Sequence, residues 1–159
     1  MLEKEFLEII QPILELEEFN DTKKRKHHGI TRFDHSMNVA YITYIVCKNM
    51  KLNYKEATFA ALLHDFFNSE VANENGYKRL VDHPKIALKN SEKYFNLTPL
   101  QKDIITKHMF PVTLTPPKYK ESVLVSLIDK YSSINERMYT SIRDIKELPI
   151  IKDIILQTR

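Results

Sequence analysis

Hydrophobic residues recur at helical spacing through most of the chain. The first helix is predicted by apolar residues at Leu2, Phe6, Ile9, Ile10 and Ile13. Pro12 predicts a kink or break within it, because proline cannot donate the helical hydrogen bond. A nearly continuous apolar run predicts a deeply buried helix from about Phe33 to Met50. No segment alternates with the period of two that marks a strand, and 2 glycines in 159 residues are too few for many tight turns. The pattern therefore predicts an all-α fold of about six or seven helices.

Capping signals predict two further helices between residues 53 and 94. Asn53 and Glu56 have the spacing of a capping box, which predicts a helix that carries His64 and Asp65. The polar stretch 68–81 is predicted as a loop. Asp82 then caps a helix that has Pro84 in its first turn and runs through Tyr94.

The last third of the chain predicts three more helical segments. Thr98, Pro99 and Gln101 form a strong start signal for a helix that ends near His108, and the sequence TPPKYK follows as a loop. A core-facing helix carrying Asp129 is predicted from apolar residues at Leu124, Leu127, Ile128 and Tyr131. The tail repeats isoleucine at helical spacing, which predicts a final packing helix or a dimer helix, through Ile150, Ile151, Ile154 and Ile155. We expect one domain over 1–159, with its core motifs in about 28–140.

Composition is that of an ordinary globular protein, with 43% hydrophobic and 28% charged residues. The net charge of +3 is too small to indicate a nucleic-acid-binding protein. Cys47 is the single cysteine, which excludes an intrachain disulfide and a thiolate metal cluster. We find no secretory signal and no apolar run of membrane-spanning length, so a cytoplasmic protein without a membrane partner is expected.

Ionisable residues interrupt two strongly apolar runs. His64 and Asp65 lie within FAALLHDFF, and Asp129 lies within VLVSLIDKY. Burying such groups without partners costs several kcal/mol, on the order of the desolvation penalty of an isolated ion. A bound metal cation would remove this cost, because one cation satisfies several ligands at once.

These residues belong to an ordered set that resembles the HD-domain phosphohydrolase superfamily. The motifs are RFDHS with His35, LLHDFF, DHPKIALKN with His83, ITKHMFP with His108, and SLIDKYSS with Asp129. The resemblance implies a helical bundle around a metal site. A lone His-Asp pair would carry no weight, whereas the order His, His-Asp, His, His, Asp in these contexts is specific.

The resemblance also implies a role for each of the six residues. His35, His64, Asp65 and Asp129 are expected to bind a first metal, and His83 and His108 a second, with Asp65 as the bridge. The implied catalytic residues are Asp65, His83 and His108. The expected cofactors are one or two divalent ions, with Fe or Mn favoured over Co, Ni, Mg or Zn. Such ions lower the pKa of a bound water and neutralise phosphoryl oxygens. The alternative to metal binding is that His83 and His108 each cap a helix end or face solvent.

The chain departs from the commoner family pattern after the His-Asp pair. Many members continue with Ile-Gly-Lys, whose lysine can meet a phosphate, but here Phe66, Phe67 and Asn68 follow. The candidate replacement cations for substrate binding are Arg32, Lys107 and Lys118. Arg32 could equally form a surface ion pair. Phe67 or Tyr131 could stack a base if either faces the cleft. The basic run 23–28 is either a solvated loop or a funnel for anionic substrates.

The leading hypothesis is a metal-dependent phosphohydrolase acting on a small nucleotide or nucleotide-like phosphoester. Hydrolysis of a dinucleoside polyphosphate such as diadenosine tetraphosphate is one variant. The first alternative is a non-catalytic, metal-dependent nucleotide sensor on the same fold, because turnover and binding need the same ligands. The second is a nucleic-acid-binding helical protein that uses the basic run, although no regular recognition-helix pattern accompanies it. A homodimer through the tail is a further expectation.

Overall fold

Seven α-helices form the described part of the computed structural model, which covers 4–24, 26–27, 30–67 and 76–146. They are α1 (Lys4–Leu14), α2 (Glu17–Asn20), α3 (Arg32–Asn49), α4 (Tyr54–Leu63), α5 (Gly76–Glu92), α6 (Pro99–Lys107) and α7 (Lys120–Lys146). A 3₁₀ turn, η1 (Asp21–Lys24), follows α2, and β1 (Lys26–His27) pairs antiparallel with β2 (Ile30–Thr31) before α3. The all-α prediction is confirmed. This two-residue pairing was not predicted, because so short a segment shows no alternation.

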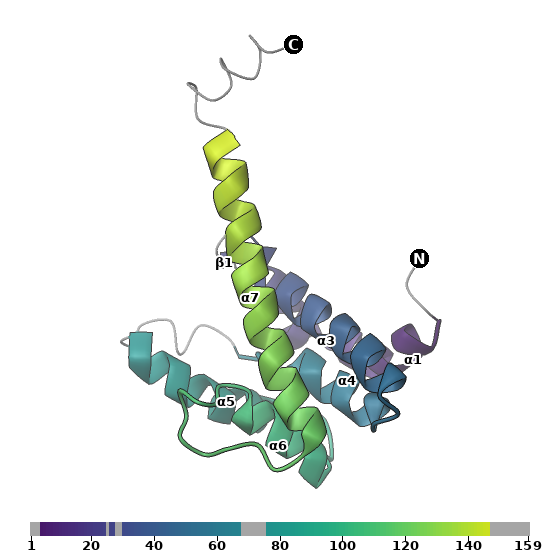
Figure 1. The fold of residues 1–159 in the computed structure, drawn as a ribbon. Helices are drawn as coiled ribbons and strands as arrows, with labels where there is room; N and C mark the ends of the chain where they lie inside the picture. Colours follow the sequence, from purple (N-terminus) through teal and green to yellow (C-terminus); the bar gives the residue numbers. More distant parts are fainter. Residues whose placement is uncertain (1–3, 25, 28–29, 68–75, 147–159) are drawn as a thin grey trace.

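Helix α4 lies at the centre of the bundle, where it contacts α1, α3, α6 and α7 (Figure 1). Most of its side chains are buried, namely Ala57, Thr58, Ala60, Ala61, Leu62 and Leu63. The alanines let neighbouring helices approach closely, and the two leucines fill the space at the carboxyl end of α4. His64, the residue that follows Leu63, is consequently also fully buried.

The predicted bounds of α3 are correct to within one residue. The helix begins with a complete capping box, in which the Thr31 hydroxyl accepts from the Asp34 amide and the Asp34 carboxylate accepts from the Thr31 amide. Because this cap fixes where the helix starts, His35 lies in the first turn, with its side chain buried.

Several helix boundaries differ from the sequence prediction. Helix α1 is not broken at Pro12 but ends two residues later, at Leu14. Helix α4 ends at Leu63, so His64 is its carboxyl-terminal cap and Asp65 lies in the following turn. Asn53 caps α4 as predicted, yet its backbone amide donates to Glu121 and only its side-chain amide donates to Glu56, so the capping box is only half formed.

The prediction for α5 was wrong at its amino-terminal end. The helix begins at Gly76, which places Asp82 and Pro84 inside it rather than at its start. Pro84 removes one backbone donor from the helix. The ring of His83, the preceding residue, contacts the carbonyl of Arg79 through Nδ1 at 2.9 Å. The first turns of α5 therefore extend into the stretch that was predicted as a loop.

Helix α6 starts where the sequence predicts, and its cap also ties it to α4. The Thr98 hydroxyl accepts from the Gln101 amide, the Gln101 side chain accepts from the Thr98 amide, and the Thr98 hydroxyl donates to Glu56. The helix ends at Lys107, and His108 is its carboxyl-terminal cap.

We expect Thr98→Ala to lower the free energy of unfolding by about 1 kcal/mol, because the amino-terminal amides of α6 lose their acceptor. Urea denaturation followed by circular dichroism measures this change. Thr106→Ala is the matched control, since the Thr106 hydroxyl bonds only to carbonyls of its own helix. Equal stability of wild type and Thr98→Ala would contradict the expected role of this cap.

Helix α7 is the longest helix and extends beyond the rest of the bundle (Figure 1). It exposes a row of large apolar side chains along one side, Leu127, Tyr131, Ile134 and Met138. The predicted tail helix lies outside the described residues, and a homodimer stays a prediction. In the part of the chain that the structure describes, we find no helix with both the length and the apolar character needed to cross a bilayer.

Candidate metal centre

The fold brings all six predicted metal-ligating residues into one buried cluster. Each comes from a helix or its end: His35 from the first turn of α3, His64 and Asp65 from the end of α4, His83 from α5, His108 from the end of α6, and Asp129 from the middle of α7. All of them except Asp65, which is partly exposed, are buried. Helices distant in sequence thus meet at this point.

One half of the cluster contains His35, His64 and Asp129. His35 Nε2 lies 3.0 Å from Asp129 Oδ1, and His64 Nε2 lies 3.6 Å from the same oxygen. The candidate ligand atoms of these three residues lie within 4.8 Å of one another. Two imidazoles and a carboxylate at this separation suit a divalent transition-metal ion.

The other half gathers around Asp65. His83 Nε2 and His108 Nε2 lie 3.2 Å and 3.7 Å from Asp65 Oδ1, while His64 Nε2 lies 3.8 Å from Asp65 Oδ2. Candidate ligand atoms of His64, Asp65 and His108 also lie within 4.8 Å of one another. Asp65 therefore has one oxygen toward each half, which is the placement that a bridging carboxylate requires.

Backbone carbonyls orient three of the four imidazoles. Nδ1 of His64, His83 and His108 lies 2.7 to 2.9 Å from the carbonyl oxygens of Ala61, Arg79 and Ile105. A carbonyl can only accept, so Nδ1 carries the proton and donates in each case. The Nε2 atoms of the neutral rings are then left with lone pairs that point into the cluster, as in metal-ligating histidines.

Two candidate ligand atoms in the cluster are buried without a hydrogen-bond partner. They are His64 Nε2 and Asp65 Oδ1. In addition, His83 Nε2 and His108 Nε2 lie only 2.8 Å apart, although their Nδ1 protons make both of these atoms acceptors in the neutral rings. Orphaned acceptors are costly in a protein interior, and a cation among them would satisfy all of them. The residues present therefore fit a metal centre.

Burial and charge shift the pKa values within the cluster in opposite directions. Burial and the neighbouring His64 and His83 lower the pKa of His108 to about 3, which keeps its ring neutral. Burial also disfavours charge on His35, but hydrogen bonds to Asp129 and Glu136 outweigh it and raise its pKa to about 10. Although burial opposes their ionisation, the surrounding histidines lower the pKa of both Asp65 and Asp129. The carboxylates are thus ionised and able to bind cations.

Glu136 is a functional candidate that the sequence analysis missed. Its Oε2 accepts from His35 Nδ1 at 2.8 Å, and its Oε1 accepts from Asn38 at 3.0 Å. It follows Asp129 by two helical turns on α7, and this seven-residue spacing was the signal that could have revealed it. Glu136 orients His35 in the way that the carbonyls orient the other three histidines.

We expect Glu136→Gln to weaken metal binding by about 10- to 100-fold, the usual cost of losing a carboxylate partner of a ligating histidine. Titration of metal-depleted protein with Mn²⁺, followed by isothermal calorimetry, measures the affinity. Asn38→Ala removes a neighbour of Glu136 without touching His35 and is the control. An unchanged Mn²⁺ affinity in Glu136→Gln would show that the hydrogen bond from His35 to Glu136 does not contribute to metal binding.

The cluster opens into a cavity of about 430 Å³ between α3, α5 and α7, a volume typical of small-molecule sites. Apolar side chains line much of it, including Ile30, Phe67, Leu80, Met109, Val112 and Ile134. Arg32 lies in this lining, where it donates to the Phe67 carbonyl at 2.7 Å and its guanidinium stacks 3.7 Å from the centre of the Phe67 ring. Its role in substrate binding stays a prediction. The Phe67 ring also lies against the His83 ring, and a base-stacking role for Phe67 stays a prediction.

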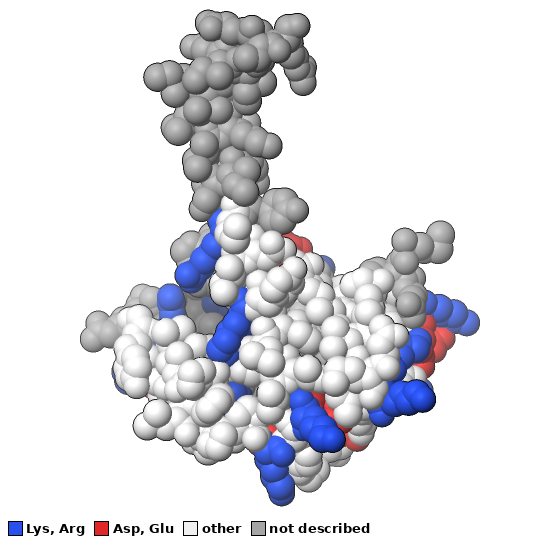
Figure 2. Space-filling model, in the orientation of Figure 1, with Lys and Arg blue, Asp and Glu red and all other residues white. Residues whose placement is uncertain are grey.

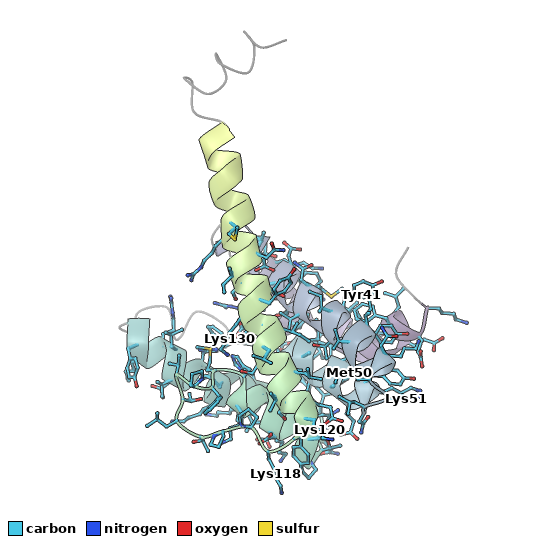
Figure 3. All side chains as sticks on the ribbon, viewed as in Figure 1. Tyr41, Met50, Lys51, Lys118, Lys120 and Lys130 are labelled. Atoms are coloured by element: carbon cyan, nitrogen blue, oxygen red, sulfur yellow. The ribbon has the colours of Figure 1, made fainter. Side chains whose placement is uncertain are left out.

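The other predicted substrate contacts are not part of this lining. Lys107 and Lys118 are not among the lining residues, and Figure 3 shows Lys118 near the lower edge of the molecule, far from Lys130 beside α7. Tyr131 is 62% exposed and is also absent from the lining. Substrate roles for these residues stay predictions. Within the basic run, Lys23 packs on the Phe33 ring, and the funnel likewise stays a prediction.

Lys130 is a lining cation that the sequence analysis did not select. Its Nζ donates to the His108 carbonyl at 2.8 Å and to the Ser126 hydroxyl at 2.8 Å, and the same hydroxyl donates to the His108 carbonyl at 2.7 Å. Burial lowers the pKa of Lys130. These bonds tie the end of α6 to α7, and they fix the backbone of His108 relative to Asp129.

The profile of the HD domain family matches residues 32–134, which is more than half of the chain. The chain therefore belongs to the HD domain family, whose superfamily comprises metal-dependent phosphohydrolases. All six residues of the cluster lie within the matched segment. Neither the curated proteins nor the solved structures gave a match.

Proposed function

We propose that this protein hydrolyses a small phosphorylated substrate, most simply a nucleotide, at a centre of two divalent metal ions. The observation that carries the proposal is the convergence of four imidazole Nε2 atoms on Asp65 and Asp129, with His64 Nε2 and Asp65 Oδ1 buried and unpartnered. His35, His64, Asp65 and Asp129 would hold one ion. His83, His108 and the other oxygen of Asp65 would hold the second.

The residues of the cluster have separable roles in this proposal. When bound, the ions would supply an acidified water and neutralise phosphoryl charge. The ionised Asp65 and Asp129 keep their charge under burial because the histidines surround them. His108 suits ligation better than proton donation, because its low pKa and its Nδ1 contact with Ile105 leave only a lone pair facing the cluster.

The cavity supports a substrate that is larger than inorganic phosphate. Its volume of about 430 Å³ and its apolar lining leave room for an organic group beside the ions. A nucleotide fits a cavity with apolar lining residues and a charged metal centre at one end. A dinucleoside polyphosphate is a larger substrate of the same nucleotide class. Iron or manganese is favoured as the metal because imidazole and carboxylate ligands are mixed.

The test begins with elemental analysis of protein purified without chelator, followed by a hydrolysis screen. The screen should include nucleoside mono-, di- and triphosphates, diadenosine tetraphosphate, and simple phosphate esters. Metal-dependent release of phosphate or of a shorter nucleotide, lost with chelator and restored by metal, supports the proposal. Tight nucleotide binding without turnover would instead indicate a sensor, and strongly salt-dependent binding of DNA or RNA would indicate the nucleic-acid alternative.

A further inference from the structure

Four cations line the cavity beside the metal centre, and they differ in what they contact. They are Arg32, Arg79, Lys130 and Arg137. Arg32 is held by the carbonyl and ring of Phe67, and Lys130 is held by carbonyls of α6 and α7. By contrast, neither Arg79 nor Arg137 forms a side-chain hydrogen bond or ion pair with any described residue.

The acidic residues of the same cavity are not available to these two arginines. The lining contains Asp65, Asp129 and Glu136. Both aspartates face the histidines of the metal centre, and Glu136 accepts from His35 and Asn38. The protein therefore places two guanidinium groups at a cavity whose carboxylates are engaged elsewhere.

The positions of Arg79 and Arg137 separate them from the reacting phosphoryl group. Arg79 precedes His83 by four residues on α5, so it lies one helical turn, or about 6 Å, along the axis. Arg137 follows Asp129 by eight residues on α7, which is about 12 Å along the axis. Figure 2 shows basic side chains along α7 on the face turned to the viewer. Arg137 is exposed and Arg79 is partly exposed, whereas His83 and Asp129 are buried. An anion bound by the two arginines would therefore lie outward from the candidate metal ligands.

We propose that Arg79 and Arg137 bind a second anionic group of the substrate, so that the preferred substrates carry two or more phosphates rather than one. Guanidinium groups bind phosphate oxygens in pairs of parallel hydrogen bonds, and such charge-assisted bonds are strong in a partly enclosed cavity. The substrate class is then a nucleoside di- or polyphosphate, with the terminal group at the ions and the adjacent phosphate at the arginines. This inference rests on the proposed function, whose site it extends.

The test compares two non-hydrolysable probes, methylenediphosphonate with two anionic groups and methylphosphonate with one. Calorimetry with metal-loaded protein measures both dissociation constants for wild type, Arg79→Gln, Arg137→Gln and Lys89→Gln. Lys89→Gln removes one positive charge from exposed α5 surface outside the cavity lining and is the matched control. Each arginine substitution should weaken the diphosphonate about tenfold and the monophosphonate less than twofold, because charge-assisted hydrogen bonds are lost only with the larger probe.

Two results would overturn the inference. One is an equal loss for both probes, which would make the arginines a general attraction for anions. The other is unchanged diphosphonate binding in both arginine variants. Failure of the proposed function would give a different result. A protein that binds the diphosphonate through Arg79 and Arg137 but hydrolyses no phosphoester would contradict the proposed hydrolysis and leave this inference intact. Conversely, either of the two results above, found in a protein that still hydrolyses phosphoesters, refutes only this inference.

Discussion

Asp65→Asn should leave the protein with little or no bound metal and lower its phosphohydrolase turnover by about three orders of magnitude. Asp65 faces His83 and His108 with one oxygen and His64 with the other. The amide that replaces the carboxylate is neutral and has only one acceptor oxygen, so it can serve neither half of the centre fully. Losing several kcal/mol of charge stabilisation corresponds to this factor in rate.

The measurement is metal per chain by elemental analysis, together with turnover on the best substrate from the screen. Asp82→Asn is the matched control, because it makes the same chemical change on α5, where surface Lys85 is the one ion-pair partner of Asp82 among the described residues. Circular dichroism confirms that each variant is folded. Full metal content and activity in Asp65→Asn would exclude Asp65 as the bridging residue.

The sequence predicted the helices best where the capping residues determine the helix ends locally. Thr98 with Gln101 marked the start of α6, and the apolar run from Phe33 marked α3 to within one residue. The start of α5 was missed because the proline rule treats Pro84 as a first-turn residue, whereas packing against α6 keeps the helix intact on both sides of it. Tertiary contacts therefore overrode the local signal.

The candidate metal ligands could be selected from the sequence because three of them interrupt apolar runs and all six follow a specific order. Their metal binding stays a prediction. Their partners were harder to find, since Glu136 and Arg79 lie in polar segments where a charged residue is unremarkable. The roles proposed for them depend on which helices meet. Glu136 reaches His35 because α7 packs against α3, and Arg79 lines the cavity because α5 borders it. Lys107, chosen because it precedes His108, is not among the residues that line the cavity, so neighbours along the chain need not both line it.

His83→Ala and His108→Ala should each reduce the metal content from two ions per chain to one and lower turnover by about a hundredfold or more. Both rings contact Asp65 Oδ1 and each other through Nε2, whereas His35 and Asp129 lie in the other half of the cluster. The remaining ion keeps its ligands, so these variants should stay folded and retain metal. The loss in turnover follows because the second ion is expected to help generate and orient the nucleophile.

His35→Ala provides the reciprocal comparison, because it removes a ligand from the half that contains Asp129. We expect it to release the other ion and to spare the one near His83 and His108. Metal content, measured beside turnover with excess Mn²⁺ or Fe²⁺ supplied, separates the two halves. Wild-type protein that is fully active with one ion would show that His83 and His108 transfer protons or bind phosphate instead. Two ions in wild type and two in His83→Ala would show that His83 is not a ligand. The short distance between the Nε2 atoms of His83 and His108 would then have to be explained by another cation or by a proton between them.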